Sequence, residues 1–361
     1  MTTTYNFSAG PATLPDSVLD EIRDSLLRRD GRPTVLEIGH NTSAFGAVMA
    51  EVDDLLRELG DVPDDFEILH VHGGARMQFS AVPLNLLGRS PGAHAYYVET
   101  GYFAQQARLE ASRYGRVERL ASSEETRFDR IPDIDASRID PGAAYVHITS
   151  NNTVYGTQWR RFPETGDVPL VVDATSDILS RVVDMSRVGL LYAGVQKNLG
   201  PPAMAVVFIR RSLLGHARRD TPLLLDYATY AKHGSRYNTP NMFVLDVMRL
   251  VLRWMKAEGG VAALEARNEQ KARCLYDVID ASGFYAGAAR PEHRSAMNVT
   301  FHLPSPELTA LFVGEAHASG LLALGGHRLV GGVRASLYNA MPHQGAQALA
   351  AFMQHFEESH G

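Results

Sequence analysis

Short apolar runs alternate with amphipathic stretches through the first two thirds of the chain. The runs cover 66–71, 93–98, 144–149, 169–173, 189–193 and 204–209, and helical spacing of apolar residues covers 43–59, 76–87 and 102–114. Continuous apolar runs are typical of strands that are buried on both faces. Their alternation with helices therefore predicts an α/β fold, with a mostly parallel sheet covered by helices on both sides.

The pattern changes after a long helix predicted over 242–257. Gly259 and Gly260 follow, and beyond them the spacing predicts helices over 261–282, 306–318 and 343–358 and strands over 297–302 and 332–338. Such a mixture is typical of a smaller α+β unit. We expect a large domain over 16–258, and a small domain built from 259–361 together with an N-terminal strap, 1–15.

The N-terminal segment is expected to be extended and then helical. Pro11 and Pro15 disfavour a helix before residue 16, and Asp16 is expected to cap the helix that follows. The predicted apolar stripe of this helix consists of Val18, Leu19, Ile22, Leu26 and Leu27.

Composition and charge narrow the class of protein. The 361 residues are 45% hydrophobic with a net charge of −6, and no Lys/Arg run suggests a nucleic-acid surface. The single cysteine, Cys274, excludes an internal disulfide and fits a reducing compartment. With no signal-like start and no apolar run of membrane-spanning length, we expect a cytoplasmic protein without membrane or nucleic-acid partners.

Two residues at predicted strand ends suggest amine chemistry. Lys197 lies in a turn between two apolar runs, flanked by Gly194 and Gly200, in a chain with only three other lysines. An isolated turn lysine is usually solvated, but a glycine-flanked one can meet a ligand. Asp173 ends the run PLVVD, where a buried carboxylate needs a cationic partner. A protonated heterocycle is one such partner, and an N-cap or metal role is the alternative. The metal role is disfavoured, because no cluster of His, Cys or Glu lies near Asp173 in the sequence.

Further residues could bind anions or a planar ring. His72-Gly73-Gly74-Ala75-Arg76 runs from a predicted strand into a helix, where backbone N–H groups could bind a phosphate. Phe103 opens another helix and could stack on a ring, although core packing explains most such residues. His327, Arg328 and Arg334 add candidate anion ligands in the C-terminal part. No P-loop or dinucleotide motif is present.

Longer motifs make the family recognisable. NFSAGPA, HGGARMQF, NNTVYGT, YAGVQKN, YNTP and GGHRLVGGVRASLYNAMP occur in this order along the whole chain. In these motifs the chain resembles the phosphoserine aminotransferase family, which belongs to the class-V, fold-type-I enzymes. The resemblance implies pyridoxal 5′-phosphate as cofactor, amino acids and 2-oxo acids as substrates, and a homodimer with shared active sites. The implied reaction is the transfer of the amino group of L-glutamate to 3-phosphohydroxypyruvate, in serine biosynthesis. A role in pyridoxine (vitamin B6) biosynthesis is also known for the family.

The resemblance also implies residue roles. Lys197 would bind the cofactor covalently and move protons, and Asp173 would pair with the ring nitrogen. The remaining cofactor ligands would be Ala75, Arg76, Phe103, Thr153, Gln196 and, from the neighbouring subunit, Asn238 and Thr239. The substrate ligands would be Ser8, His40, Asn41, Arg76, His327, Arg328 and Arg334, with no metal.

Two departures from the family pattern keep alternatives open. The chain has Gly39-His40-Asn41 where the family commonly shows Ser-His-Arg, and Phe103 where it commonly shows Trp. Loss of one charge-assisted contact costs roughly 1.5–3 kcal/mol of binding. A paralogue that uses another 2-oxo acid is therefore one alternative. A lyase or decarboxylase on the same fold is another, and a non-enzymatic or nucleotide-binding protein is the third.

Overall fold

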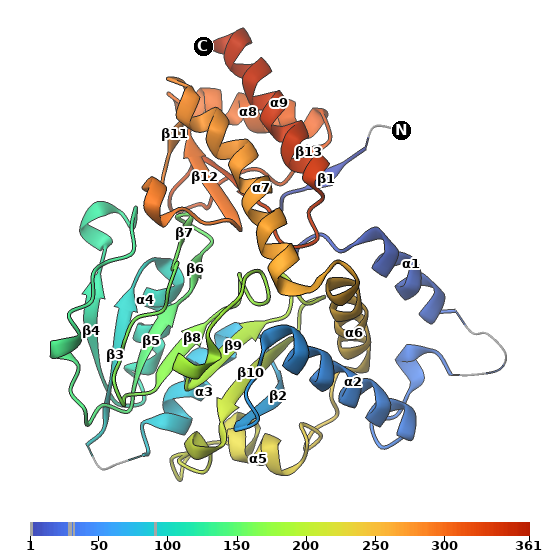
Figure 1. The fold of residues 1–361 in the computed structure, drawn as a ribbon, viewed down its shortest axis with the longest axis vertical. Coiled ribbons are helices and arrows are strands. Elements are labelled where there is room, and N and C mark those ends of the chain that lie inside the picture. The colour runs from blue at the N-terminus through green and yellow to red at the C-terminus, as the bar shows by residue number, and fades with distance from the viewer. Residues whose placement is uncertain (1–2, 28–30, 32, 90–91) are drawn as a thin grey trace.

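A seven-stranded sheet forms the centre of the molecule (Figure 1). The computed structural model describes residues 3–27, 31, 33–89 and 92–361. The strands are β2 (Phe66–His72), β3 (His94–Glu99), β4 (Arg116–Ser122), β5 (Tyr145–Thr149), β8 (Leu170–Asp173), β9 (Leu190–Gly194) and β10 (Met204–Arg210). Their spatial order is β2-β10-β9-β8-β5-β3-β4, and β10 alone among these strands runs antiparallel to its neighbours. The carboxyl ends of the other six strands therefore lie along one edge.

Helices cover both faces of this sheet, which is why its strands are apolar on both sides (Figure 1). One face packs against α1 (Asp16–Ser25), α2 (Ser43–Gly60) and α6 (Met242–Ala257). The other packs against α3 (Ala75–Leu86), α4 (Tyr102–Ala111) and α5 (Tyr227–Lys232). Short 3-10 turns link these elements: η1 (Val35–Glu37), η2 (Glu124–Thr126), η3 (Ala136–Arg138), η4 (Met185–Arg187), η5 (Arg211–Leu213) and η6 (Leu223–Leu225).

The C-terminal part has its own sheet and core. Helices α7 (Gly260–Ala281), α8 (Pro306–Ala318) and α9 (His343–His360) pack with the sheet β11 (Ala286–Gly287), β12 (Asn298–His302) and β14 (Val333–Ser336), and η7 spans Pro291–His293. The N-terminal strand β1 (Tyr5–Asn6) pairs in parallel with β13 (Leu321–Leu322), and Phe7 belongs to the same core. Strand β1 thus lies with the C-terminal part in the upper half of Figure 1. A hairpin, β6 (Asn151–Asn152) and β7 (Thr157–Gln158), lies beneath them.

Most predicted elements are confirmed within one or two residues. The α/β class and the mostly parallel sheet agree with the structure, and the helices predicted over 242–257 and 306–318 have the bounds of α6 and α8. The helix predicted over 102–114 ends three residues early, at Ala111. The first helix differs more. Pro15, rather than Asp16, is its N-cap, and Leu19, Leu26 and Leu27 are exposed, so that stripe was wrong in part. Asp16 lies in the first turn, where a negative charge still favours the helix dipole.

Candidate active site

A cavity of about 540 Å³ opens at the carboxyl edge of the large sheet. Its walls come from the loops that leave β2, β3, β5, β8 and β9, and from the segment that enters β10. Loops at this edge form the ligand site in open α/β sheets because the strand ends converge there. The lining residues include Arg76, Phe103, Thr149, Asn151, Thr153, Asp173, Thr175, Ser176, Gln196, Lys197, His327 and Arg334.

Lys197 and Asp173 share this cavity, as the sequence predicted. Lys197 follows β9, and its Nζ lies 5.7 Å from the centre of the Phe103 ring. Burial lowers the pKa of Lys197 to about 8, although the negative charge of Asp173 opposes this shift. A primary amine with such a pKa is partly neutral near neutral pH and can act as a nucleophile or base.

The Asp173 carboxylate is held at the cavity floor. It lies at the end of β8, is 5% exposed, and accepts a hydrogen bond from the Thr175 backbone N–H at 3.0 Å. Burial raises the pKa of Asp173, while the Thr175 hydrogen bonds and the charge of Lys197 lower it. A buried carboxylate in this setting gains most from a cation placed directly against it.

The N-terminus of α3 forms an anion-binding wall. Gly73 and Gly74 have φ of 88° and 72°, values that favour glycine, and the N-cap Gly74 provides no side-chain cap. The first-turn N–H groups of α3 and the Arg76 side chain therefore lie at one end of the cavity. The guanidinium of Arg76 also lies 5.8 Å from the Phe103 ring centre. This combination suits a phosphate group.

Arg334 and His327 form the wall contributed by the C-terminal part. Arg334 lies on β14, and its Nη1 donates to the Thr153 carbonyl oxygen at 3.2 Å. The pKa of His327 is lowered by burial and then by the charges of Arg334 and Arg328. These effects favour the neutral imidazole form of His327 at physiological pH.

The N-terminal strap closes the cavity from above. Ala9, Gly10 and Pro11 line it, and the Ala12 N–H donates to the Gln196 carbonyl oxygen at 3.0 Å. The Ala9 carbonyl oxygen in turn accepts from the Tyr338 hydroxyl at 2.8 Å. The strap is thus tied both to the lysine loop and to the C-terminal part.

The structure brings together nine of the predicted site residues and leaves six outside. Lining the cavity are Ala75, Arg76, Phe103, Thr153, Asp173, Gln196, Lys197, His327 and Arg334. Not lining it within one chain are Ser8, His40, Asn41, Asn238, Thr239 and Arg328. Sequence reasoning missed Thr149, Asn151, Thr175 and Ser176. Their only signal was their position at or just after the ends of the strands predicted over 144–149 and 169–173.

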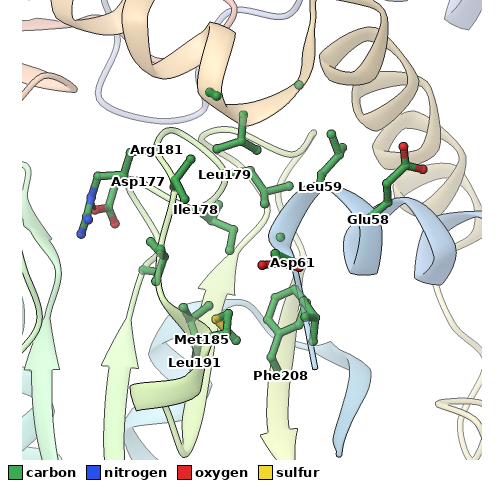
Figure 2. Close-up of a pocket in the computed structure, with 18 of the residues that line it drawn as sticks. Glu58, Leu59, Asp61, Asp177, Ile178, Leu179, Arg181, Met185, Leu191 and Phe208 are labelled. Atoms are coloured by element: carbon green, nitrogen blue, oxygen red, sulfur yellow. Dashed lines mark ion pairs between the residues drawn. The ribbon is translucent and has the colours of Figure 1, made fainter. Parts of the chain in front are cut away.

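A second cavity, of about 560 Å³, lies on the side of the sheet that packs against α2 and α6 (Figure 2). Leu59, Ile178 and Phe208 are among its mostly apolar lining residues. Three of its charged groups already have partners: the Lys256 Nζ donates to Glu58 at 2.6 Å, and Asp177 accepts from Ser150 and Gln158. Because the Lys197 cavity combines an amine, a carboxylate and an anion wall, we place the chemistry there.

Comparison with known proteins identifies the family of the chain. The family model "Aminotransferase class-V" matches residues 4–349. A phosphoserine aminotransferase of Lysinibacillus sphaericus is 46% identical over 99% of this chain and 98% of its own. Solved structures of the phosphoserine aminotransferases of Bacillus circulans subsp. alkalophilus and, with bound pyridoxal phosphate, of Trichomonas vaginalis superpose with TM-scores of 0.96 and 0.92. They are 40% and 33% identical, and the match covers 99% and 98% of this chain and 99% and 100% of theirs.

These matches define the class of the protein. The chain belongs to the class-V aminotransferase family, whose enzymes depend on pyridoxal 5′-phosphate. Within that family it belongs to the group of phosphoserine aminotransferases.

The cavity residues fit this cofactor. The Thr149 hydroxyl is buried in the cavity wall without a hydrogen-bond partner among the described residues, as expected for a group that faces a polar ligand. Lys197 supplies the amine for an aldehyde, Asp173 a carboxylate for a ring nitrogen, and the α3 N-terminus donors for a phosphate. In the part of the chain that the structure describes, no cluster of His, Cys, Asp or Glu could hold a metal ion, and no helix is long and apolar enough to cross a membrane.

Proposed function

We propose that the chain transfers the amino group of L-glutamate to 3-phosphohydroxypyruvate, giving 2-oxoglutarate and O-phospho-L-serine. The observation that carries this proposal is the convergence of Lys197, Asp173, Arg76 and Arg334 on one cavity. This cavity has more cationic than anionic side chains, which suits substrates with two or three negative charges. The 46% identity to a phosphoserine aminotransferase over nearly the whole chain supports the same substrate.

Each residue has a role in the proposed mechanism. The cofactor, when bound, supplies the electron sink that stabilises negative charge at the substrate α-carbon. Asp173 holds a proton on the ring nitrogen. In the first half-reaction the neutral amine of Lys197 removes the α-proton of L-glutamate, and in the second it delivers a proton to the α-carbon of the newly formed amino acid. Arg334 holds the substrate α-carboxylate and so orients the α-C–H bond toward Lys197.

Different residues would bind the phosphate of the cofactor and the phosphate of the substrate. The α3 N-terminus and Gln196 hold the cofactor phosphate, and Arg76 and His327 bind the distal group of the substrate. Since a neutral imidazole is favoured for His327, Arg76 would supply the positive charge that binds the distal group of the substrate. Steady-state kinetics with phosphorylated and unphosphorylated hydroxypyruvate test this assignment. A large preference for the phosphorylated acid supports it, and equal kcat/KM values contradict it.

We also propose that two copies of the chain share their active sites. His40, Asn41, Asn238 and Thr239 do not line the cavity of their own chain, so their roles as ligands require a second copy. Mixing two inactive variants, Lys197→Ala and the double variant Asn238→Ala/Thr239→Ala, tests this. If sites are shared, mixed dimers contain one intact site and regain activity. If they are not shared, the mixture stays as inactive as its parts.

A second candidate function has one specific feature in its favour. Asn41 replaces an arginine that the family commonly uses for the distal anion of the substrate. A 2-oxo acid with a neutral or less charged side chain would then be the true acceptor. A panel of 2-oxo acids with L-glutamate as donor separates the two functions.

A further inference from the structure

A layer of buried polar side chains lies directly beneath the cavity floor. Asp173 on β8 and Tyr192 on β9 are register partners on neighbouring parallel strands, so their side chains lie next to each other on one face of the sheet, and the Asp173 charge acts on the Tyr192 hydroxyl. The Tyr192 hydroxyl also lies 3.0 Å from Nε2 of His147 on β5. The exposed fractions of Tyr192 and His147 are 0% and 1%, so no water solvates these groups from outside.

A second pair of polar aromatics extends this layer away from the cavity. Tyr97 on β3 is the register partner of His147, and the two rings stack at 4.7 Å between centroids. The Tyr97 hydroxyl shares a 2.7 Å hydrogen bond with the Tyr145 hydroxyl. Tyr145 therefore has the same chemistry and burial as Tyr192, but its hydrogen bond leads away from Asp173.

The protonation states of this layer follow from its burial. Burial lowers the pKa of His147 to about 3, so its imidazole is neutral and carries a single N–H. Burial, together with the nearby Asp173 charge, raises the pKa of Tyr192 well above its usual value, so its hydroxyl stays protonated. A neutral phenol beside a buried carboxylate acts as a donor to it.

One arrangement of the protons satisfies these groups best. His147 Nδ1 is buried and has no hydrogen-bond partner among the described residues. If Nδ1 carried the proton, an N–H donor would be left unpaired, which is rarer and costlier in proteins than an unpaired lone pair. The proton is therefore on Nε2 and is donated to the Tyr192 oxygen, which leaves the Tyr192 proton free for Asp173.

We propose that Tyr192 and His147 are positioning residues for Asp173, arranged as the chain His147 Nε2–H to Tyr192 oxygen and Tyr192 O–H to the Asp173 carboxylate. The chain holds the carboxylate ionised and turned toward the cavity, where the ring nitrogen of the cofactor would lie. Lys197 and Asp177 are the other charged groups that act on Asp173, with opposite effects. This inference rests on the proposed aminotransferase function.

The test compares Tyr192→Phe with Tyr145→Phe, a matched control that removes an equally buried hydroxyl from the same face. Each protein is loaded with ¹⁵N-labelled pyridoxal 5′-phosphate, and the NMR shift of the ring nitrogen is followed from pH 6 to 9. In the native protein and in Tyr145→Phe, the nitrogen keeps its proton throughout. In Tyr192→Phe the nitrogen loses its proton within this range, and kcat falls about 10- to 100-fold with little change in KM.

His147→Phe completes the test, because it keeps the ring that stacks on Tyr97. It should shift the nitrogen titration in the same direction, and the double variant should be no worse than Tyr192→Phe alone. An unshifted titration in Tyr192→Phe, or equal shifts in Tyr192→Phe and Tyr145→Phe, overturns the inference. Failure of the native protein to aminate phosphohydroxypyruvate would instead reject the proposed function, because the nitrogen titration does not depend on that substrate.

Discussion

Gly10 of the N-terminal strap lies directly against the Lys197 side chain. A Cβ atom on Gly10 would lie 3.5 Å from Cγ and 3.6 Å from Cε of Lys197, and Gly10 has φ of +139°. These are ordinary van der Waals distances, so position 10 requires glycine for its backbone conformation rather than for space. The contact links the start of the sequence to the proposed reactive amine.

Gly10→Ala should lower both stability and activity. The alanine must adopt a φ that L-residues rarely accept, at a cost of about 1–2 kcal/mol, and relief of that strain would displace the strap residue that contacts Lys197. Thermal unfolding and kcat measure the two effects. Gly166→Ala is the control, because Gly166 also has a positive φ of +60° but nothing within 4 Å of its would-be Cβ. It should lose stability but keep its kcat, and an equal loss of kcat would show that the Lys197 contact is unimportant.

The uptake of cofactor by the apoprotein should depend on pH through Lys197. Only the neutral amine condenses with an aldehyde, so the rate should rise with pH and level off above a midpoint near 8, the lowered pKa of Lys197. Because Asp173 raises this pKa, Asp173→Asn should move the midpoint to lower pH. Stopped-flow absorbance of the bound cofactor measures the rate. A midpoint near 10 in the native protein would mean that burial does not lower the pKa of this lysine.

Asp173→Asn should also reduce turnover. The amide carries no charge, so it would no longer raise the pKa of a ring nitrogen placed against it. We therefore expect kcat to fall by about 100- to 1000-fold. Steady-state assays with L-glutamate check this. The two effects of one substitution then separate, because uptake becomes easier at low pH while turnover collapses. Turnover close to that of the native protein would remove Asp173 from the mechanism.

Arg334→Gln should weaken every substrate alike. Arg334 would hold the α-carboxylate, which all amino-acid and 2-oxo-acid substrates share, so KM should rise about 10- to 100-fold for both substrates. The Arg76→Gln variant should instead discriminate against phosphohydroxypyruvate. Comparing kcat/KM for phosphorylated and unphosphorylated acids in the two variants distinguishes the roles. If Arg334→Gln affected only the phosphorylated acid, the two assignments would have to be exchanged.

Lys271→Met should destabilise the fold. The buried Lys271 amine donates at 2.8 Å to the carbonyl oxygens of Leu337 and Tyr338, in the segment that follows the Arg334 strand. Removing it leaves these acceptors unpaired, and we expect a loss of about 2–5 kcal/mol in the free energy of unfolding. Urea denaturation measures this, with the exposed Lys232→Met as a control that should change stability by about 0.5 kcal/mol or less. Similar losses in both variants would argue against the buried hydrogen bonds.

The order of buried strands and helices was predictable because burial on both faces leaves a continuous apolar run. β4 was not predicted, since it is an edge strand whose sequence, RVERLAS, is largely polar. The pairing of β1 with β13 could not be predicted either, because a two-residue strand shows no periodicity and its partner lies more than 300 residues away in the sequence. Tertiary contacts alone define such elements.

For the site, the sequence identified residues with distinctive chemistry and missed those whose role is positional. Lys197 and Asp173 carry a local signal in their type and in the strands before them. Thr149 and Ser176 are ordinary polar residues until several loops meet around them. The same is true of Tyr192 and His147, which from the sequence alone look like parts of an apolar run.

The strap that covers Lys197 also belongs to the core of the C-terminal part, through β1 and Phe7. One short segment therefore packs into the C-terminal core and also covers the Lys197 amine. Deleting the N-terminal strap would loosen the C-terminal core and would also expose Lys197 to water. Because the N-terminal strap contacts the site, a fusion partner attached after α9 should disturb the site less than one attached before the strap.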